Sequence, residues 1–150
     1  MKALVQRVSE ASVDIGGVCA GRIGKGIVIL LGIAVTDTPE DAELLAEKCA
    51  NLRIFNDDND KMNLSLIDIA GHALVISQFT LCGDCSRGRR PGYTDAARPE
   101  LAMPLYEHFI CEIRKFGIKT ETGKFGAMMQ VHILNSGPVT LMVEIPARRN

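Results

Sequence analysis

Polar side chains interrupt two otherwise apolar, strand-like stretches of this 150-residue sequence. The first is residues 77–81, Ser-Gln-Phe-Thr-Leu, at the end of a β-branched run. The second is residues 135–140, Asn-Ser-Gly-Pro-Val-Thr, where a Gly-Pro pair stands between two apolar runs. Proline has no N–H group for a central ladder, so the pair indicates an edge bend, a tight turn or a cis peptide bond. Both segments are candidates for a function beyond packing.

The more familiar catalytic pattern, a Ser-His-Asp system, is incomplete. Ser136 lacks the G-x-S-x-G elbow that exposes a serine nucleophile. Three histidines are available as partners, namely His72, His108 and His132. No hydrolytic triad can be assigned from their spacing.

Two further patterns resemble metal sites. Cys82 and Cys85 have C-x-x-C spacing, but a zinc site needs a second pair or histidines at ligand spacing, and none is near in the sequence. Residues 56–60, Asn-Asp-Asp-Asn-Asp, resemble half a calcium loop but lack the glycine and the distal glutamate. A strand end with its turn is favoured for the cysteines, and a solvated turn for the acidic run.

A cluster of arginines lies in a segment rich in glycine, proline and serine, opposed only by Asp84 and Asp95. Its members are Arg87, Arg89, Arg90 and Arg98. Such a cluster could follow a phosphate backbone or could be a solvated surface loop. The residues alone leave both readings open.

Composition limits the classes of protein further. The length and the 47% apolar content fit one folded domain covering residues 1–150. The formal net charge of -1 argues against a strongly cationic protein that coats duplexes. The longest apolar run, residues 27–35, falls far short of the about 20 residues that span a membrane. Five scattered cysteines favour reduced thiols and a cytoplasmic location.

The apolar periodicity predicts mainly strands. They are expected at residues 4–8, 11–15, 27–33, 52–55, 73–81, 118–122, 129–134 and 139–145. The glycines Gly16 and Gly17 predict a tight hairpin, and the continuous run 27–33 predicts a strand buried on both faces. We therefore expect an α+β fold with a mostly antiparallel, barrel-like sheet covered by two helices.

The first predicted helix starts at Pro39, is capped by Thr38 and buries a stripe of small and apolar residues. That stripe is Ala42, Leu45, Ala46 and Cys49. The second covers residues 99–116 and ends at Gly117, with Pro104 expected to kink it or delay its start. Its expected core face is Leu101, Leu105, Phe109, Ile113 and Phe116.

Taken together, these segments resemble the D-aminoacyl-tRNA deacylase family, of the D-tyrosyl-tRNA deacylase type. The resemblance runs through the whole chain and rests on residues 6–8, 26–32, 61–65, 77–81, 88–91, 123–129 and 135–140. The pairing of Ser-Gln-Phe-Thr with Asn-x-Gly-Pro-Val-Thr is its most specific part. Ser136 departs from the acidic residue that the family usually has there.

The resemblance implies a homodimer that hydrolyses the ester between a D-amino acid, or glycine, and the 3′-terminal adenosine of tRNA. It implies no metal and no organic cofactor. It also implies a cis Gly137–Pro138 bond, inserted into the partner subunit's pocket so that its carbonyl groups exclude L-amino acids. Rejection by a clash is physically sound, because a clash discriminates more reliably than a weakened attraction.

The residue roles that follow are expectations of the same kind. Catalysis is expected at Gln78, Phe79 and Thr80, whose backbone N–H groups could hold the developing oxyanion. Substrate binding is expected at Ser77, Phe125, Met129, Gly137 and Pro138. Arg7 is expected to support the Gly-Pro loop, and Arg87, Arg89 and Arg90 to contact the tRNA backbone. Thr80 has no neighbouring base in sequence, so a covalent role for its hydroxyl is not expected.

Two alternatives belong to other classes. One is a non-catalytic RNA-binding module that uses the arginine cluster. The other is the sister family with a trans Gly-Pro pair, which acts on L-alanine mischarged on tRNA. The sister family departs at residues 77–79, where this sequence keeps the D-specific form.

Overall fold

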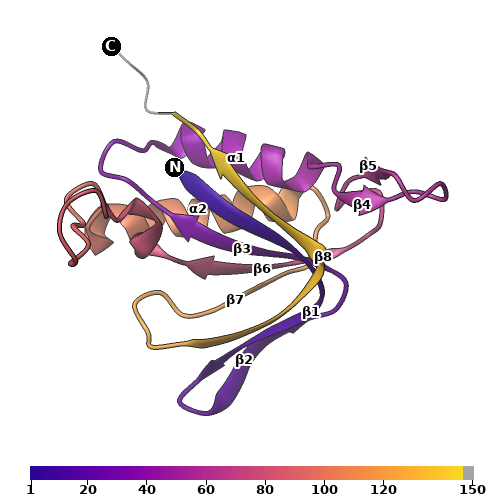
Figure 1. Cartoon of the computed structure of the whole chain (residues 1–150), viewed down its shortest axis with the longest axis horizontal. Helices are drawn as coiled ribbons and strands as arrows, with labels where there is room; N and C mark the ends of the chain where they lie inside the picture. The colour runs from indigo at the N-terminus through magenta and orange to yellow at the C-terminus, as the bar shows by residue number, and fades with distance from the viewer. Residues whose placement is uncertain (147–150) are drawn as a thin grey trace.

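The computed structural model describes residues 1–146. Two helices, α1 (Pro39–Asn51) and α2 (Pro99–Lys115), pack against each other and cover a curved sheet (Figure 1). The strands of the sheet are β1 (Lys2–Ile15), β2 (Val18–Ile23), β3 (Gly26–Gly32), β6 (His72–Ser77), β7 (Thr120–Thr122) and β8 (Gln130–Glu144). A separate small hairpin joins β4 (Phe55–Asn56) to β5 (Met62–Leu64). The expected α+β class is confirmed.

Strand β1 is central to the sheet because it is long enough to pair with three other strands. Its first half pairs with β3, its second half pairs with β2, and β8 runs antiparallel along its other edge. The strand order is β2-β1-β3-β6-β7, and β8 is attached to β1 alone. Among the described residues, antiparallel pairings predominate, but β3–β6 and β6–β7 are parallel. The sheet is therefore mixed, and its parallel part was not expected from the sequence.

The two ends of this strand order curl toward each other. Strand β2 lies so near β7 that a Cβ atom at Gly21 would sit 3.2 Å from the carbonyl oxygen of Thr122. A side chain at this position would push the two strands apart, so glycine is what permits the approach. The sheet is consequently almost closed into a barrel, as expected.

Apolar side chains fill both faces of the central strand β3. Ile27 and Ile29 point to the core under the two helices, whereas Val28 joins a second cluster with Leu74 on the inner side of the curl. All four are essentially inaccessible. The prediction of a strand buried on both faces is confirmed.

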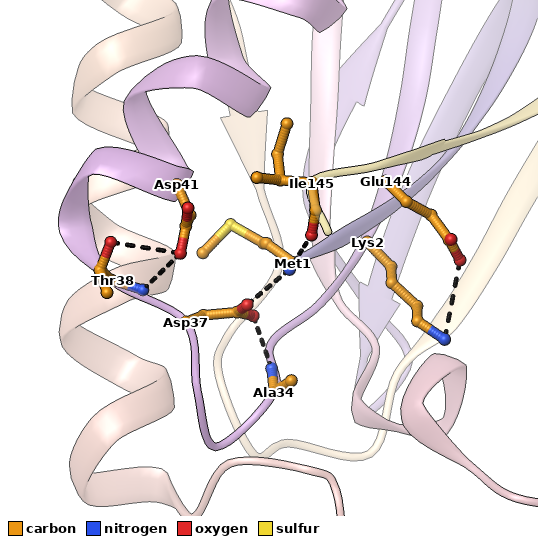
Figure 2. A network of polar contacts seen from close by, with 8 residues as sticks. All are labelled: Met1, Lys2, Ala34, Asp37, Thr38, Asp41, Glu144 and Ile145. Carbon is orange, nitrogen blue, oxygen red and sulfur yellow. Dashed lines mark hydrogen bonds and ion pairs between the residues drawn. The ribbon is translucent and has the colours of Figure 1, made fainter. Parts of the chain in front are cut away.

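The start of α1 is fixed by a buried network that includes the N-terminus (Figure 2). The ammonium group of Met1 lies 2.5 Å from an oxygen of Asp37 and also donates to the carbonyl oxygen of Ile145 at 3.2 Å. The second Asp37 oxygen accepts from the backbone N–H of Ala34 at 2.7 Å. Thr38 is the N-cap, and the predicted buried stripe of α1 is confirmed.

Helix α2 begins where it was predicted, without the delay expected from Pro104, but its buried face differs in part from the prediction. It begins at Pro99 although Pro104 lies inside it, because only one backbone donor is lost there. Leu101 and Phe116 are 39% and 37% exposed, so their expected core positions are wrong. Leu105, Phe109 and Ile113 are buried as predicted. Gly117 ends the helix with φ +77°, the left-handed conformation expected of a terminating glycine.

Three predicted strands are shorter than expected, and one of them, 118–122, forms β7 only over Thr120–Thr122. The run 73–81 forms β6 only as far as Ser77, after which Phe79–Cys82 is a 3₁₀ turn. The ladder stops because the parallel neighbour β3 ends at Gly32, and the N–H of Gln78 makes the last bond, 2.8 Å to Leu31. The predicted strand 52–55 is reduced to the two residues of β4. The two C-terminal runs, by contrast, form the single strand β8.

Within residues 1–146, no helix has the length and apolarity that crossing a membrane requires.

Candidate active site

A cavity of about 640 Å³ opens where the parallel strands β3 and β6 end. We call it the β6 pocket. Among the predicted site residues it is lined by Ser77, Gln78, Phe79, Phe125 and Met129. Residues 77–79 follow β6, whereas Phe125 and Met129 belong to the connection between β7 and β8. The fold therefore brings together two segments that are almost fifty positions apart in the chain.

The 3₁₀ turn gives the pocket its polar edge. The first N–H groups of such a turn, those of Phe79 and Thr80, have no partner inside the turn itself. The side-chain amide of Gln78 donates to the hydroxyl of Thr80. Thr80 is exposed and is not part of the pocket lining. The turn thus offers backbone donors, while the hydroxyl of Thr80 is already engaged.

Phe79 connects the pocket to the loop that carries the arginine cluster, which we call the arginine-rich loop (residues 84–92). Its side chain is 55% exposed, and its ring meets the ring of Tyr93 edge-on at 5.1 Å. The loop closes through a backbone bridge between Asp84 and Gly92. Its arginines, Arg87, Arg89 and Arg90, are exposed and do not line the β6 pocket.

The opposite wall is stiffened by Tyr106 of α2. Its hydroxyl donates to the carbonyl oxygen of Val75 at 2.9 Å, and its ring lies 5.9 Å from that of Phe125. Burial raises the pKa of Tyr106 to about 12, so the hydroxyl stays protonated and keeps donating. Tyr106 therefore fixes α2 on β6 directly behind Phe125.

The Gly-Pro pair lies within β8, at the point where the register against β1 is interrupted. The Gly137–Pro138 peptide bond is cis, as the sequence led us to expect. Arg7 of β1 donates through Nε to the carbonyl oxygen of Ser136 at 3.1 Å and through Nη1 to Ile54 at 2.7 Å. Arg7 thus contacts the segment that it was expected to support, and its role in the site stays a prediction.

Asn135 provides the second tie to this loop, which we call the Gly-Pro loop (residues 135–139). Its side-chain amide donates to the carbonyl oxygens of Arg7 and Val139, at 2.9 and 3.0 Å. Gly137 has φ +118°, and a Cβ atom there would lie 2.7 Å from Nη2 of Arg7. The position is consequently reserved for glycine. Neither Gly137 nor Pro138 lines the β6 pocket of its own chain.

Potential metal ligands gather elsewhere. In the part of the chain that the structure describes, Glu43, His108 and Glu112 form the one cluster whose ligand atoms lie within 4.8 Å of one another. His108 is 3.1 Å from Glu43, and Lys115 pairs with Glu112 at 2.5 Å. These contacts account for the cluster through one polar contact between α1 and α2 and one ion pair within α2. None of its members lines the β6 pocket.

The sequence analysis missed several apolar residues of the pocket. They are Leu31, Ile33, Ile76, Ala97, Pro99, Ala102 and Val131. One rule could have located these residues, because ligands in open sheets bind beyond the carboxyl ends of parallel strands. The sequence analysis could not apply this rule, because it expected a mostly antiparallel sheet.

Comparison with solved structures first defines the class of fold. A structure titled a probable eukaryotic D-amino acid tRNA deacylase matches 96% of this chain with a TM-score of 0.83, at 17% identity. A second, titled c-Myc DNA Unwinding Element Binding Protein, matches 98% of this chain and 100% of its own, with a TM-score of 0.92 and 43% identity. The chain thus shares its fold with both of these structures.

The family follows from sequence. A family model described as D-Tyr-tRNA(Tyr) deacylase matches residues 4–144, and the chain belongs to this family. A D-aminoacyl-tRNA deacylase of Fervidobacterium nodosum is 58% identical over 144 residues, covering 96% of this chain and 97% of the relative. One of Desulfatibacillum aliphaticivorans is also 58% identical, with 96% and 99% covered. The predicted resemblance, and with it the assignment to a family of hydrolases, is confirmed.

Proposed function

We propose that this chain is a single-domain enzyme that hydrolyses the ester of D-aminoacyl-tRNA and of glycyl-tRNA in the β6 pocket. The observation that carries the proposal is the convergence of Ser77, Gln78 and Phe79 with Phe125 and Met129 around one cavity. Membership of the deacylase family supports it. The products are a free amino acid and tRNA, and no cofactor is required.

The chemistry needs little from side chains. An aminoacyl ester is already activated, so water can attack its carbonyl carbon if the developing oxyanion is stabilised. The N–H groups of Phe79 and Thr80 are suited to this, because they begin the 3₁₀ turn without an internal partner. The ribose hydroxyl next to the ester would orient the water. The hydroxyl of Thr80 accepts from the amide of Gln78 and takes no covalent part.

Chiral selection requires a second copy of the chain. The Gly-Pro loop lies outside the pocket of its own subunit, so a partner would have to supply it. Strand β8 pairs with β1 on one side only and carries the exposed apolar residues Leu134, Leu141 and Met142. An edge strand with such side chains is a surface that proteins cover. We therefore propose a homodimer in which the loop of each subunit closes the pocket of the other.

In this arrangement the carbonyl groups of the Gly-Pro loop face the α-carbon of the substrate. An L-amino acid would direct its side chain into that wall, whereas a D-amino acid directs it outward and glycine has none. Rejection then comes from a clash rather than from a weaker attraction. Arg7 serves as the support of the wall, since it holds Ser136 from behind.

The arginine-rich loop provides the contact with the tRNA body. Arg87, Arg89 and Arg90 are exposed near Phe79, where they could neutralise phosphates of a tRNA whose 3′ end enters the pocket. A cytoplasmic location fits a substrate of translation.

The decisive experiment measures amino acid release by the purified chain from matched D-, L- and glycyl-tRNA. We expect release from the D- and glycyl-forms only. Release from L-alanyl-tRNA instead would identify the sister activity, and tRNA binding without any release would identify an RNA-binding module. A monomeric mass in solution with full D-selectivity would contradict the shared site.

A further inference from the structure

A second cavity, of about 590 Å³, lies next to the β6 pocket. Phe125 lines both cavities. The same elements also line both, because α2 contributes Pro99 and Ala102 to the β6 pocket and residues from Met103 to Arg114 to the second cavity. The β7–β8 connection contributes residues 122–125 to the second cavity and 125–129 to the first. The two cavities are therefore neighbours along α2 and this connection, and we call the second one the α2 groove.

The α2 groove has the surface that single-stranded nucleotides require. Its floor is apolar, with Met103, Tyr106 and Ile110 among the residues of α2. Exposed cations lie along it, Arg114 on the helix and Lys124 on the connection, against the single carboxylate of Glu107. Apolar and aromatic surface combined with positive charge is the pattern on which bases stack and phosphates are neutralised.

The length of the groove also fits. From Ala102 to Arg114 the helix rises by about 18 Å, several times the roughly 3.4 Å that one nucleotide occupies along a duplex strand. Arg114 donates one N–H to the carbonyl oxygen of Thr120 at 3.0 Å, which orients its guanidinium group and leaves other donors available.

We propose that the α2 groove binds the unpaired nucleotides that precede the terminal adenosine of tRNA, with Arg114 and Lys124 contacting their phosphates. This inference rests on the proposed function, since it takes the aminoacyl-adenosine to lie in the β6 pocket. It separates two tasks, with the α2 groove reading the single-stranded end and the arginine-rich loop contacting the body of the tRNA.

Substrates of increasing length test the proposal. We expect the wild-type chain to cleave a D-aminoacyl-CCA trinucleotide with a higher kcat/KM than D-aminoacyl-adenosine. Lys124→Gln and Arg114→Gln should remove most of this gain while affecting the adenosine substrate far less. Together they should make the negative slope of log(kcat/KM) against log(salt) shallower by about 1.4, at about 0.7 per phosphate of a single strand.

Matched variants make the outcome specific. Lys48→Gln removes the same charge from α1, outside the groove, and should leave the gain intact. Arg114→Lys keeps the charge and should retain most of the gain, which a purely structural role through Thr120 would not allow. An undiminished gain in both Gln variants, or an equal loss on adenosine and trinucleotide, would overturn the proposal.

A footprint tests the groove without relying on turnover. Cys111 lines the α2 groove and is exposed, whereas Cys19 on β2 and Cys85 in the arginine-rich loop are exposed elsewhere. A CCA trinucleotide with a non-hydrolysable 3′-amide of a D-amino acid should protect Cys111 from alkylation and leave Cys19 and Cys85 reactive. Protection of Cys85 without Cys111 would contradict the groove. If the wild-type chain cleaves no ester at all, the proposed function fails, and the footprint still decides the groove.

Discussion

The Gly-Pro loop and the 3₁₀ turn of the β6 pocket differ in how their polar groups are satisfied. In the loop, Arg7 donates to the carbonyl oxygen of Ser136, and Asn135 donates to the carbonyl oxygens of Arg7 and Val139. The hydroxyl of Thr140 donates to the side chain of Asn135 at 3.3 Å. In the turn, the side chain of Gln78 donates to that of Thr80, and the first backbone N–H groups have no partner inside the turn. The Gly-Pro loop is therefore fixed by internal hydrogen bonds, whereas the first backbone donors of the 3₁₀ turn have no partner inside the turn.

This difference teaches how the two segments would divide the work. A wall that rejects the wrong enantiomer must keep its position without a ligand, so it needs internal hydrogen bonds. A site that stabilises a transient oxyanion must keep its donors free until the substrate arrives. Damage to the loop should therefore cost stability and selectivity, whereas damage to side chains of the turn should cost some rate and little stability.

Replacement of Arg7 by alanine should have the largest effect. It removes the bonds to Ser136 and Ile54, and hydrogen bonds made by charged groups contribute about 1.5–3 kcal/mol. We expect the free energy of unfolding in urea to fall by about 2–3 kcal/mol and L-aminoacyl-tRNA to become a substrate. Arg22→Ala, at an exposed position of β2, is the control. A change of stability no larger than that of the control would contradict a supporting role.

Replacement of Gly137 by alanine should come next. The new Cβ would collide with Nη2 of Arg7, and φ +118° is unfavourable for any L-residue. We expect a loss of about 1–2 kcal/mol in the free energy of unfolding, together with weaker discrimination against L-substrates. Gly17→Ala shares a positive φ but meets no neighbour, so it isolates backbone strain from collision. Equal selectivity in the two variants would show that the collision has no consequence.

Removal of the Thr80 hydroxyl should have a smaller effect on rate. Thr80→Ala breaks one exposed hydrogen bond that helps to hold the turn, so turnover should fall roughly 2–10-fold, a rise of about 0.4–1.4 kcal/mol in the activation free energy, and the stability should hardly change. Thr80→Ser, which keeps the hydroxyl, should retain most of the turnover. Single-turnover assays distinguish these values, and complete inactivity of Thr80→Ala or a trapped threonyl ester would restore a covalent role.

The smallest expected effect is on stability at acid pH, and it arises in the turn between β4 and β5. Hydrogen bonds from the Asn63 side chain and from the backbone of Lys61 and Asn59 lower the pKa of Asp57. A lowered pKa in the folded state gives stability that is present above the unfolded value of about 3.9 and is lost as pH falls through the folded value. We expect Asp57→Asn to destabilise the chain slightly at pH 6 and not at pH 2, as judged by thermal unfolding. A difference that persists unchanged at pH 2 would contradict this origin.

Much of the fold could be predicted, because it depends on local chemistry. The glycine pair in the first hairpin has φ +58° and +80°, and Gly117 ends α2 as its backbone freedom requires. The unbroken apolar run of β3 follows from burial on two faces. The exposed positions of Leu101 and Phe116 could not be predicted, because helical periodicity identifies a face without fixing its width.

The candidate site remains a prediction in the roles of its residues, and five of the expected residues line the β6 pocket. Its two segments drew attention as polar interruptions of apolar strands, and family resemblance added Phe125 and Met129. What sequence could not provide is the parallel alignment of β3 with β6, which depends on a crossover through α1. That alignment ends the ladder at Ser77, turns the chain at Gln78 and adds the apolar wall of Ala97 and Ala102.

The ion pair between the ammonium group of Met1 and Asp37 is a buried charged contact with a chemical requirement. Only a free ammonium group can form it, because acylation or fusion to another peptide turns that group into an amide without charge. Asp37 would then remain as a buried carboxylate facing no cation, and the added atoms would need a path out from a site whose Met1 side is fully enclosed. The buried ion pair therefore depends on the charge of one nitrogen atom, and a tag or label joined to that atom would remove the pair.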